Sequence, residues 1–217
     1  MIELVVFLGN YGREYEKTRH NVAWQFAEKL PFYNKLNFQT KFKGQIASLD
    51  YAEFARLAVQ FYPELSKDGS NFSVPAKAPS KLFFLKPETY MNLSGQSVIE
   101  VCQFYKIKPE NVLICHDELE LNPGFFSFKW SGGLAGHNGL RSVKGVFGTP
   151  DFFRLRFGIG KPQNVNIADY VLSNFSYDEE TLLNIVFEKA SFVFAKAILA
   201  EEPSRLTAKW GKVNVNS

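Results

Sequence analysis

The sequence has few of the features that would assign it to a specialised class of protein. Its 217 residues include only two cysteines, Cys102 and Cys115, and each lies in an apolar run. A disulfide-stabilised scaffold is therefore excluded, and two buried free thiols are expected. No stretch approaches the roughly 18 consecutive apolar residues of a membrane-spanning helix, and the amino terminus lacks the basic region of a signal peptide. We therefore expect a cytoplasmic protein without a membrane partner.

An excess of charge is also lacking. The 25 Lys and Arg residues face 22 Asp and Glu residues, and the net charge of +3 is too small for a protein that coats DNA. The positive charge is nevertheless uneven, because residues 122–165 hold six basic side chains and one acidic one. This local excess is compatible with a small contact area for RNA.

The chain is rich in apolar and aromatic residues, which alternate between two patterns. Short apolar runs at residues 4–8, 81–85 and 111–116 predict buried strands. After the first run, apolar residues at helical spacing begin behind Asn21, which can cap that helix. After the second run, residues 98–105 show the same spacing. Alternation of this kind is typical of α/β proteins.

The second half of the chain predicts two more strands and a long helix. Residues 125–129 and 153–159 have strand patterns, and the latter alternates a buried face with a basic face formed by Arg154 and Arg156. A capping box at Ser176 starts a helix that runs to about residue 200, and the signals beyond it are weak.

These patterns predict an α/β fold, a single-domain sandwich with a mixed, largely parallel central sheet flanked by helices. One domain should cover residues 1–217, since 46% hydrophobic residues and 22 Phe suffice for one large core. Residues 51–79 fit least well, because they end in a segment rich in Ser, Lys and Pro. We expect there an insertion that forms a long connection or an extended hairpin, partly mobile.

Polar residues follow the predicted strands at the points where a parallel sheet binds its ligands. Asn10 ends the first strand, Asn92 lies beyond the second, Asp117 ends the third, and His20 precedes the first helix. A histidine can activate water when a carboxylate holds its other ring nitrogen, so His20 and Asp117 could form such a pair. On spacing alone, a helix-capping histidine and a turn-closing aspartate explain the pattern equally well.

Other chemistries find less support in the sequence. The glycine-rich loop at residues 132–139 matches neither the Walker nor the dinucleotide-binding pattern, and no nucleophile elbow occurs. A metal site from His20, His116, Asp117 and His137 lacks the usual ligand spacing. We expect neither a cofactor nor a metal.

Six segments together resemble bacterial peptidyl-tRNA hydrolases, in the order typical of that family. They are GNYGREYEKTRHNV (9–22), KPETYMNLSGQSV (86–98), HDELELNPG (116–124), GHNGLRS (136–142), FRLRFGIGKP (153–162) and DYVLSNF (169–175).

The resemblance implies a cytoplasmic, monomeric esterase without a cofactor, which cleaves the ester between peptide and tRNA and so recycles tRNA from aborted translation. By this resemblance His20 is the base that activates water, Asp117 keeps His20 in its basic form, and Asn10 distinguishes peptidyl-tRNA from free aminoacyl-tRNA. The enzyme would hold the acceptor stem and the peptide backbone of its substrate. The matching substrate-binding positions are Tyr15, Tyr90, Asn92, Asn138, and a basic pair for the 5′ phosphate, Lys129 and Arg156.

Several questions stay open at this level. The oxyanion donor is the amide of Asn92 or Asn10, or a backbone N–H of the glycine loop. Tyr11 replaces the family's usual proline, and Ala135 replaces a usual glycine. The alternatives to the hydrolase are a catalytically inactive RNA-binding homologue and a metal-dependent hydrolase.

Overall fold

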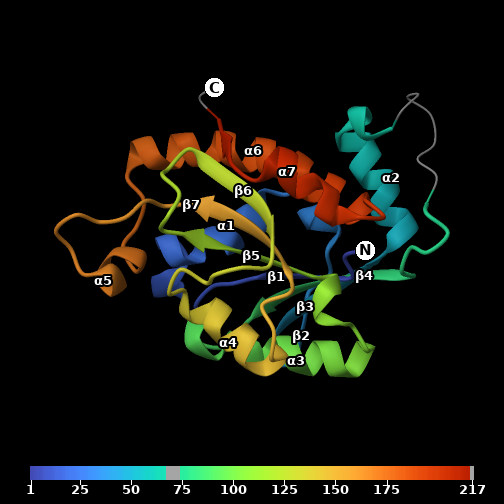
Figure 1. Cartoon of the computed structure of the whole chain (residues 1–217), viewed down its shortest axis with the longest axis horizontal. Helices are drawn as coiled ribbons and strands as arrows, with labels where there is room; N and C mark the ends of the chain where they lie inside the picture. The colour runs from blue at the N-terminus through green and yellow to red at the C-terminus, as the bar shows by residue number, and fades with distance from the viewer. Residues whose placement is uncertain (67–73, 216–217) are drawn as a thin grey trace.

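The computed structural model describes residues 1–66 and 74–215, in which one mixed sheet of eight strands forms the centre (Figure 1). The strand order is β2-β3-β4-β1-β5-β7-β6-β8. Strands β4, β1, β5 and β7 are parallel to their neighbours in this group, and the remaining pairs are antiparallel. The strands are β1 Leu4–Phe7, β2 Gln39–Lys41, β3 Gly44–Asp50, β4 Lys81–Pro87, β5 Val112–Glu118, β6 Phe125–Trp130, β7 Phe153–Gly158 and β8 Val213–Asn214.

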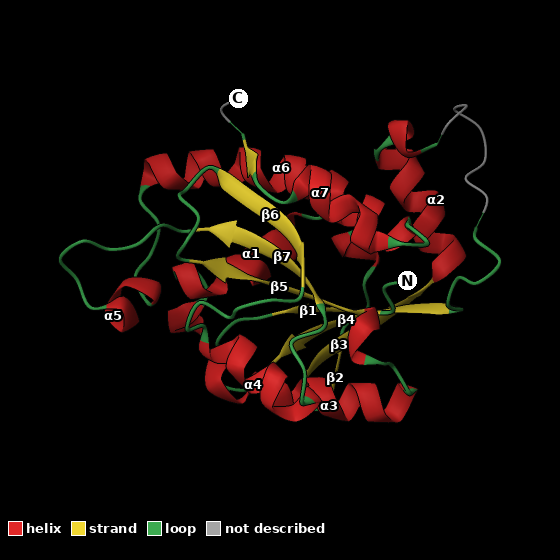
Figure 2. Cartoon of the chain, in the orientation of Figure 1, coloured by secondary structure: helices red, strands yellow, loops and turns green. Residues whose placement is uncertain are grey.

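Helices cover both faces of the sheet (Figure 2). One face packs against α1, α2 and α6, and the other against α3 and α4. The α-helices are α1 Val22–Lys29, α2 Tyr51–Phe61, α3 Ser94–Tyr105, α4 Asn138–Phe147, α5 Ile167–Val171, α6 Tyr177–Leu199 and α7 Thr207–Trp210. The 3₁₀ helices are η1 Arg13–Tyr15, η2 Arg19–Asn21, η3 Tyr33–Lys35, η4 Pro63–Leu65, η5 Met91–Leu93, η6 Pro109–Asn111 and η7 Pro203–Leu206. The predicted fold class, a mixed sheet flanked by helices, is confirmed.

The near-continuous apolar runs of the central strands are explained by burial on both faces of the sheet. Along β1, Val5 and Phe7 belong to the core beneath α1 and α6, whereas Leu4 and Val6 belong to the core beneath α3 and α4. None of the helices described is long and apolar enough to cross a membrane. The predicted burial of Cys102 and Cys115 as free thiols is also confirmed.

The topology creates a crevice at the carboxyl ends of the parallel strands. Strand β1 lies between β4 and β5, so the chain moves to one side of β1 for β4 and to the other side for β5. The segments that follow these strands therefore separate at the end of β1, and such a switch point is where ligands bind in α/β sheets. Helices α3 and α4 close the face below it, where Gly95 allows close contact: an added Cβ would lie 2.3 Å from the carbonyl oxygen of Ser142.

Three expectations are corrected by the structure. The predicted connection or hairpin in residues 51–79 is wrong at its start, because Tyr51–Phe61 forms α2, whose apolar side packs on the sheet. The mobility expected there falls partly on residues 67–73, which lie outside the described residues. The basic face of β7 is not open to solvent at Arg154, whose side chain is 1% exposed. Asn21 precedes α1 as predicted, but its side chain does not cap that helix.

Candidate functional site

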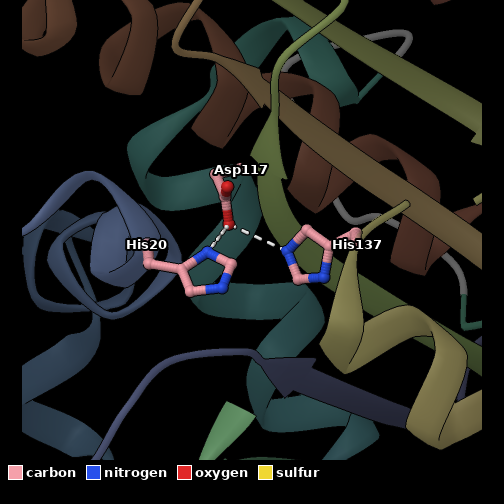
Figure 3. A group of neighbouring side chains, drawn as sticks. All are labelled: His20, Asp117 and His137. Atoms are coloured by element: carbon pink, nitrogen blue, oxygen red, sulfur yellow. Dashed lines mark hydrogen bonds and ion pairs between the residues drawn. The ribbon is translucent and has the colours of Figure 1, made fainter. Parts of the chain in front are cut away.

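The centre of the site is a hydrogen bond between His20 and Asp117. His20 lies in η2. Asp117 lies near the carboxyl end of β5, the strand that pairs with β1 beside the crevice. The Nδ1 atom of His20 is 2.8 Å from Oδ1 of Asp117, and both side chains are buried (Figure 3). The imidazole is therefore held by Nδ1, and its Nε2 is the nitrogen available to water or substrate in the cleft.

A second histidine shares the same carboxylate oxygen. His137 Nε2 is also 2.8 Å from Asp117 Oδ1, and it approaches from the α4 side of the cleft (Figure 3). The other ring nitrogen, Nδ1, accepts hydrogen bonds from the backbone N–H groups of Gly139 and Leu140. His137 is thus the N-cap of α4, and because Nδ1 is an acceptor, the proton lies on Nε2 and is donated to Asp117.

Burial and charge act in opposite directions on this group. Burial lowers the pKa of His20, but the charge of Asp117 and its hydrogen bond outweigh burial and raise that pKa above its ordinary value. Burial raises the pKa of Asp117, but attraction to His20 and His137 and the hydrogen bonds from both rings hold it well below the usual range. Asp117 is therefore an anion at neutral pH, beside a histidine made more basic by its presence.

Asn10 is fixed by its backbone and by one side of its amide. Its N–H donates to Oδ1 of Asn21 (2.8 Å), and its carbonyl oxygen accepts from Nδ2 of Asn21 (2.9 Å). Asn21 therefore fixes this turn, although Tyr11 stands where the family usually has proline. Oδ1 of Asn10 accepts from the N–H of Met91 (2.9 Å), which leaves the Nδ2 donor for the cleft.

Asn10, His20 and Asp117 border a cleft of about 630 Å³. Four other predicted residues also line it, from η1, from the start of η5 and from the start of α4: Tyr15, Tyr90, Asn92 and Asn138. Tyr90, Asn92 and Asn138 are exposed, whereas Tyr15 is half-buried. Segments far apart in the sequence thus bring one histidine–aspartate pair and three asparagine side chains into one cleft.

The structure does not place Lys129 and Arg156 among the residues that line the cleft. Pairing of β6 with β7 sets Lys129 opposite Arg154 and Ser127 opposite Arg156, so these side chains share one face. Arg156 donates to Glu118 Oε2 (3.1 Å) and to the hydroxyl of Ser127. Burial, followed by the charges of Arg156 and Arg154, lowers the pKa of Lys129. Three cations therefore gather around one carboxylate.

Sequence reasoning missed several contributors to the site. His137 entered it only as a candidate metal ligand, because histidine is not among the residues that helices prefer at the N-cap. Asn21 and Met91, which hold Asn10, carried no separate signal. One wall of the cleft, formed by α5 and the residues next to it, also carried no separate signal in the sequence. This wall includes Ile167, Val171 and Leu172.

His20, Asp117 and His137 also form a group whose ligand atoms lie within 4.8 Å of one another, as a metal would require. Their hydrogen bonds do not suit a metal, because a ligating nitrogen must present a lone pair. His137 Nδ1 is occupied as the cap of α4, which places the proton on Nε2 facing Asp117. As bonded here, the donor set does not fit a metal ion.

Comparisons with known proteins show which family this chain is similar to. The sequence model of the peptidyl-tRNA hydrolase family matches residues 4–216. A peptidyl-tRNA hydrolase of Treponema pallidum is 46% identical over 176 residues, which are 80% of this chain and 76% of that protein. One of Neisseria meningitidis is 38% identical over 210 residues, 96% of this chain and 93% of that protein. Among solved structures, a peptidyl-tRNA hydrolase from Acinetobacter baumannii superposes with a TM-score of 0.75 at 32% identity, over 97% of this chain and 94% of that one.

Proposed function

The chain belongs to the peptidyl-tRNA hydrolase family, and from this premise we propose that it hydrolyses the ester between peptide and tRNA by histidine-activated water. The observation that carries the proposal is the His20–Asp117 hydrogen bond at 2.8 Å, with His20 Nε2 left for the cleft. A water molecule on Nε2 gives up a proton as its oxygen attacks the ester carbonyl carbon. Asp117 stabilises the imidazolium that forms, and that proton then goes to the departing ribose oxygen.

The negative charge that develops on the carbonyl oxygen needs a hydrogen-bond donor. The N–H groups of Gly139 and Leu140 already donate to His137, which removes them from this role. The Nδ2 group of Asn10 is better suited, because Met91 holds the amide oxygen and thereby orients the amide. We assign this donor to Asn10, a contribution of about 3 kcal/mol to the transition state.

The other polar groups of the cleft suit a substrate whose peptide sequence varies. Each asparagine amide offers a donor and an acceptor, the complement of a peptide bond. Asn92 and Asn138 would therefore bind the peptide backbone independently of its side chains. Tyr15 and Tyr90 offer ring faces to the terminal base, sugar or peptide.

We assign the 5′ phosphate of the acceptor stem to Lys129 and Arg156. Support comes from their common face and from the excess of cations over carboxylates there. We also propose, as the family resemblance implies, that the protein is a monomer that acts in the cytoplasm, where translation releases its substrate. Size-exclusion chromatography tests the oligomeric state.

The decisive assay is release of peptide from N-acetyl-aminoacyl-tRNA by purified protein. Wild type should turn over, and His20→Ala should lose nearly all activity while circular dichroism shows that it remains folded. Equal, negligible rates for both would leave only the RNA-binding alternative. Activity abolished by a chelator and restored by a metal would refute the proposed metal-independent mechanism.

The phosphate contact is tested by substrate length. Lys129→Ala should raise KM for full-length peptidyl-tRNA more than for a short nucleotide ester, because only the former carries the 5′ phosphate. Lys35→Ala, which removes an exposed lysine of η3, is the matched control and should change neither KM. Equal effects of Lys129→Ala on both substrates would remove the phosphate assignment.

A further inference from the structure

His137 connects the two halves of the site through both of its ring nitrogens. Nε2 donates to Asp117, at the end of β5, and Nδ1 accepts from the first N–H groups of α4. The two nitrogens diverge from the ring, so a flip or a large rotation of the ring would break both bonds. The ring therefore fixes the distance between the carboxylate and the helix that carries Asn138.

The surroundings of His137 leave it little freedom. Its side chain is 7% exposed, and its ring centroid lies 4.9 Å from that of His20 and 5.0 Å from that of His116. Gly139 packs against it so closely that an added Cβ would lie 3.1 Å from the ring and 2.5 Å from the sulfur of Met91. Such packing holds the ring against Asp117.

The bond from His137 also affects the charge of Asp117. Oδ1 accepts from His20 and from His137. Each of these hydrogen bonds stabilises the carboxylate, and each weakens the bond that the carboxylate makes to the other ring. His20 itself must bind a proton and release it within each turnover. A carboxylate with only one donor would bind the imidazolium more tightly and would also be freer to rotate.

We propose that His137 is a positioning residue for the hydrolysis reaction: it orients Asp117 and limits how strongly that carboxylate retains the proton on His20, while it anchors the N-terminus of α4. The kinetic part of this inference rests on the proposed function. Its effect on the titration of His20 does not.

Two substitutions separate the two bonds of His137. Asparagine is a strong N-cap, so His137→Asn keeps an acceptor for Gly139 and Leu140, but its shorter amide stops short of Asp117. His137→Ala loses both bonds. A difference between the variants reports the cap, and a change common to both reports the bond to Asp117.

For His137→Asn we expect a thermal midpoint close to wild type, a KM within about twofold, and a kcat roughly tenfold lower, the equivalent of one hydrogen bond to a charged group. For His137→Ala we expect the same loss in kcat together with a lower midpoint and a higher KM, because α4 and Asn138 are no longer anchored.

The second measurement is an NMR titration of the histidine ring protons, which is tractable because the chain has three histidines. In His137→Asn the pKa of His20 should rise relative to wild type, and the acid limb of kcat/KM should move to higher pH with it. A merely structural role for His137 predicts no such shift.

The outcomes are distinguishable. If wild type hydrolyses peptidyl-tRNA but His137→Asn matches it in kcat and in the titration of His20, the inference is overturned and the proposed function stands. If wild type shows no hydrolysis, the proposed function fails, and the NMR titration alone decides whether His137 modulates His20. If both variants stay folded, only His137→Ala has a lower thermal midpoint, and neither variant changes kcat or the pKa of His20, then His137 is only a helix cap and the inference is overturned.

Discussion

Replacing Asp117 by asparagine tests the chemistry of the site with the smallest change of shape. The side chain of Asp117 is 2% exposed, and its charge lies directly beside the ring that becomes positive in the transition state. Two unit charges about 4 Å apart interact by about 4 kcal/mol at an effective dielectric constant of about 20. The predicted loss in kcat is therefore about a thousandfold.

The same substitution should change the pH profile in a defined direction. His20 must be neutral to accept a proton, so kcat/KM falls as the pH drops through its pKa. Asp117 raises that pKa in the wild type, whereas burial alone lowers it. In Asp117→Asn the acid limb of kcat/KM should therefore move to lower pH, and the plateau of kcat/KM should also be lower than in the wild type.

Both effects are read from initial rates of peptide release across pH 4–9, with circular dichroism at each pH to show that the variant is folded. A variant that kept a tenth or more of the wild-type rate, with its acid limb unmoved, would refute the role of Asp117. A lower plateau with an unmoved limb would mean that Asp117 orients the ring without setting its basicity.

Three further outcomes concern RNA contact and packing. Lys129→Ala should lower the slope of log KM against log salt concentration by about 1, as expected when one phosphate contact is lost; an unchanged slope contradicts that contact. Gly95→Ala should destabilise the protein by about 3 kcal/mol in urea unfolding, because the added methyl group meets the backbone of α4. Gly145→Ala, where nothing lies within 4 Å of the added Cβ, is the control and should stabilise by about 0.5–1 kcal/mol. Asn21→Ala should cost about 2 kcal/mol, through the two buried bonds to Asn10, and should lower kcat because the oxyanion donor is less well oriented; a neutral result would show that the turn is stable without Asn21.

Much of the architecture could be predicted from the sequence because its signals are local. The apolar runs of β1, β4 and β5 and the capping box of α6 depend on neighbours within a few positions, and each appears where it was predicted. Helix α2 was missed because a Ser- and Pro-rich segment directly follows it and obscured the amphipathic pattern of Tyr51–Phe61.

Other features depended on contacts that local pattern does not contain. Arg154 alternates like an exposed residue, yet it is buried and donates to the carbonyl oxygen of Gly133 (2.7 Å). Burial and the neighbouring Arg156 lower its pKa to about 10. Ala135, a departure from the family pattern, occupies the left-handed region with φ +47°, where a glycine would be less strained.

The sequence by itself determined the elements of the fold and the residue types that carry the chemistry: a histidine, a carboxylate and asparagines near strand ends. Only the tertiary structure decided how they are connected. His20 and His137 are separated in the chain by more than a hundred residues, yet they meet at one oxygen of Asp117. The parallel strands β1 and β5 end at a common edge, which brings His20 to Asp117, and the N-terminus of α4 brings His137 to the same oxygen. The proton on His137 is then placed by a helix terminus, since the free N–H groups of α4 need an acceptor. Residue identity limits what a side chain can donate or accept, but its partner is set by the packing of elements far apart in the chain.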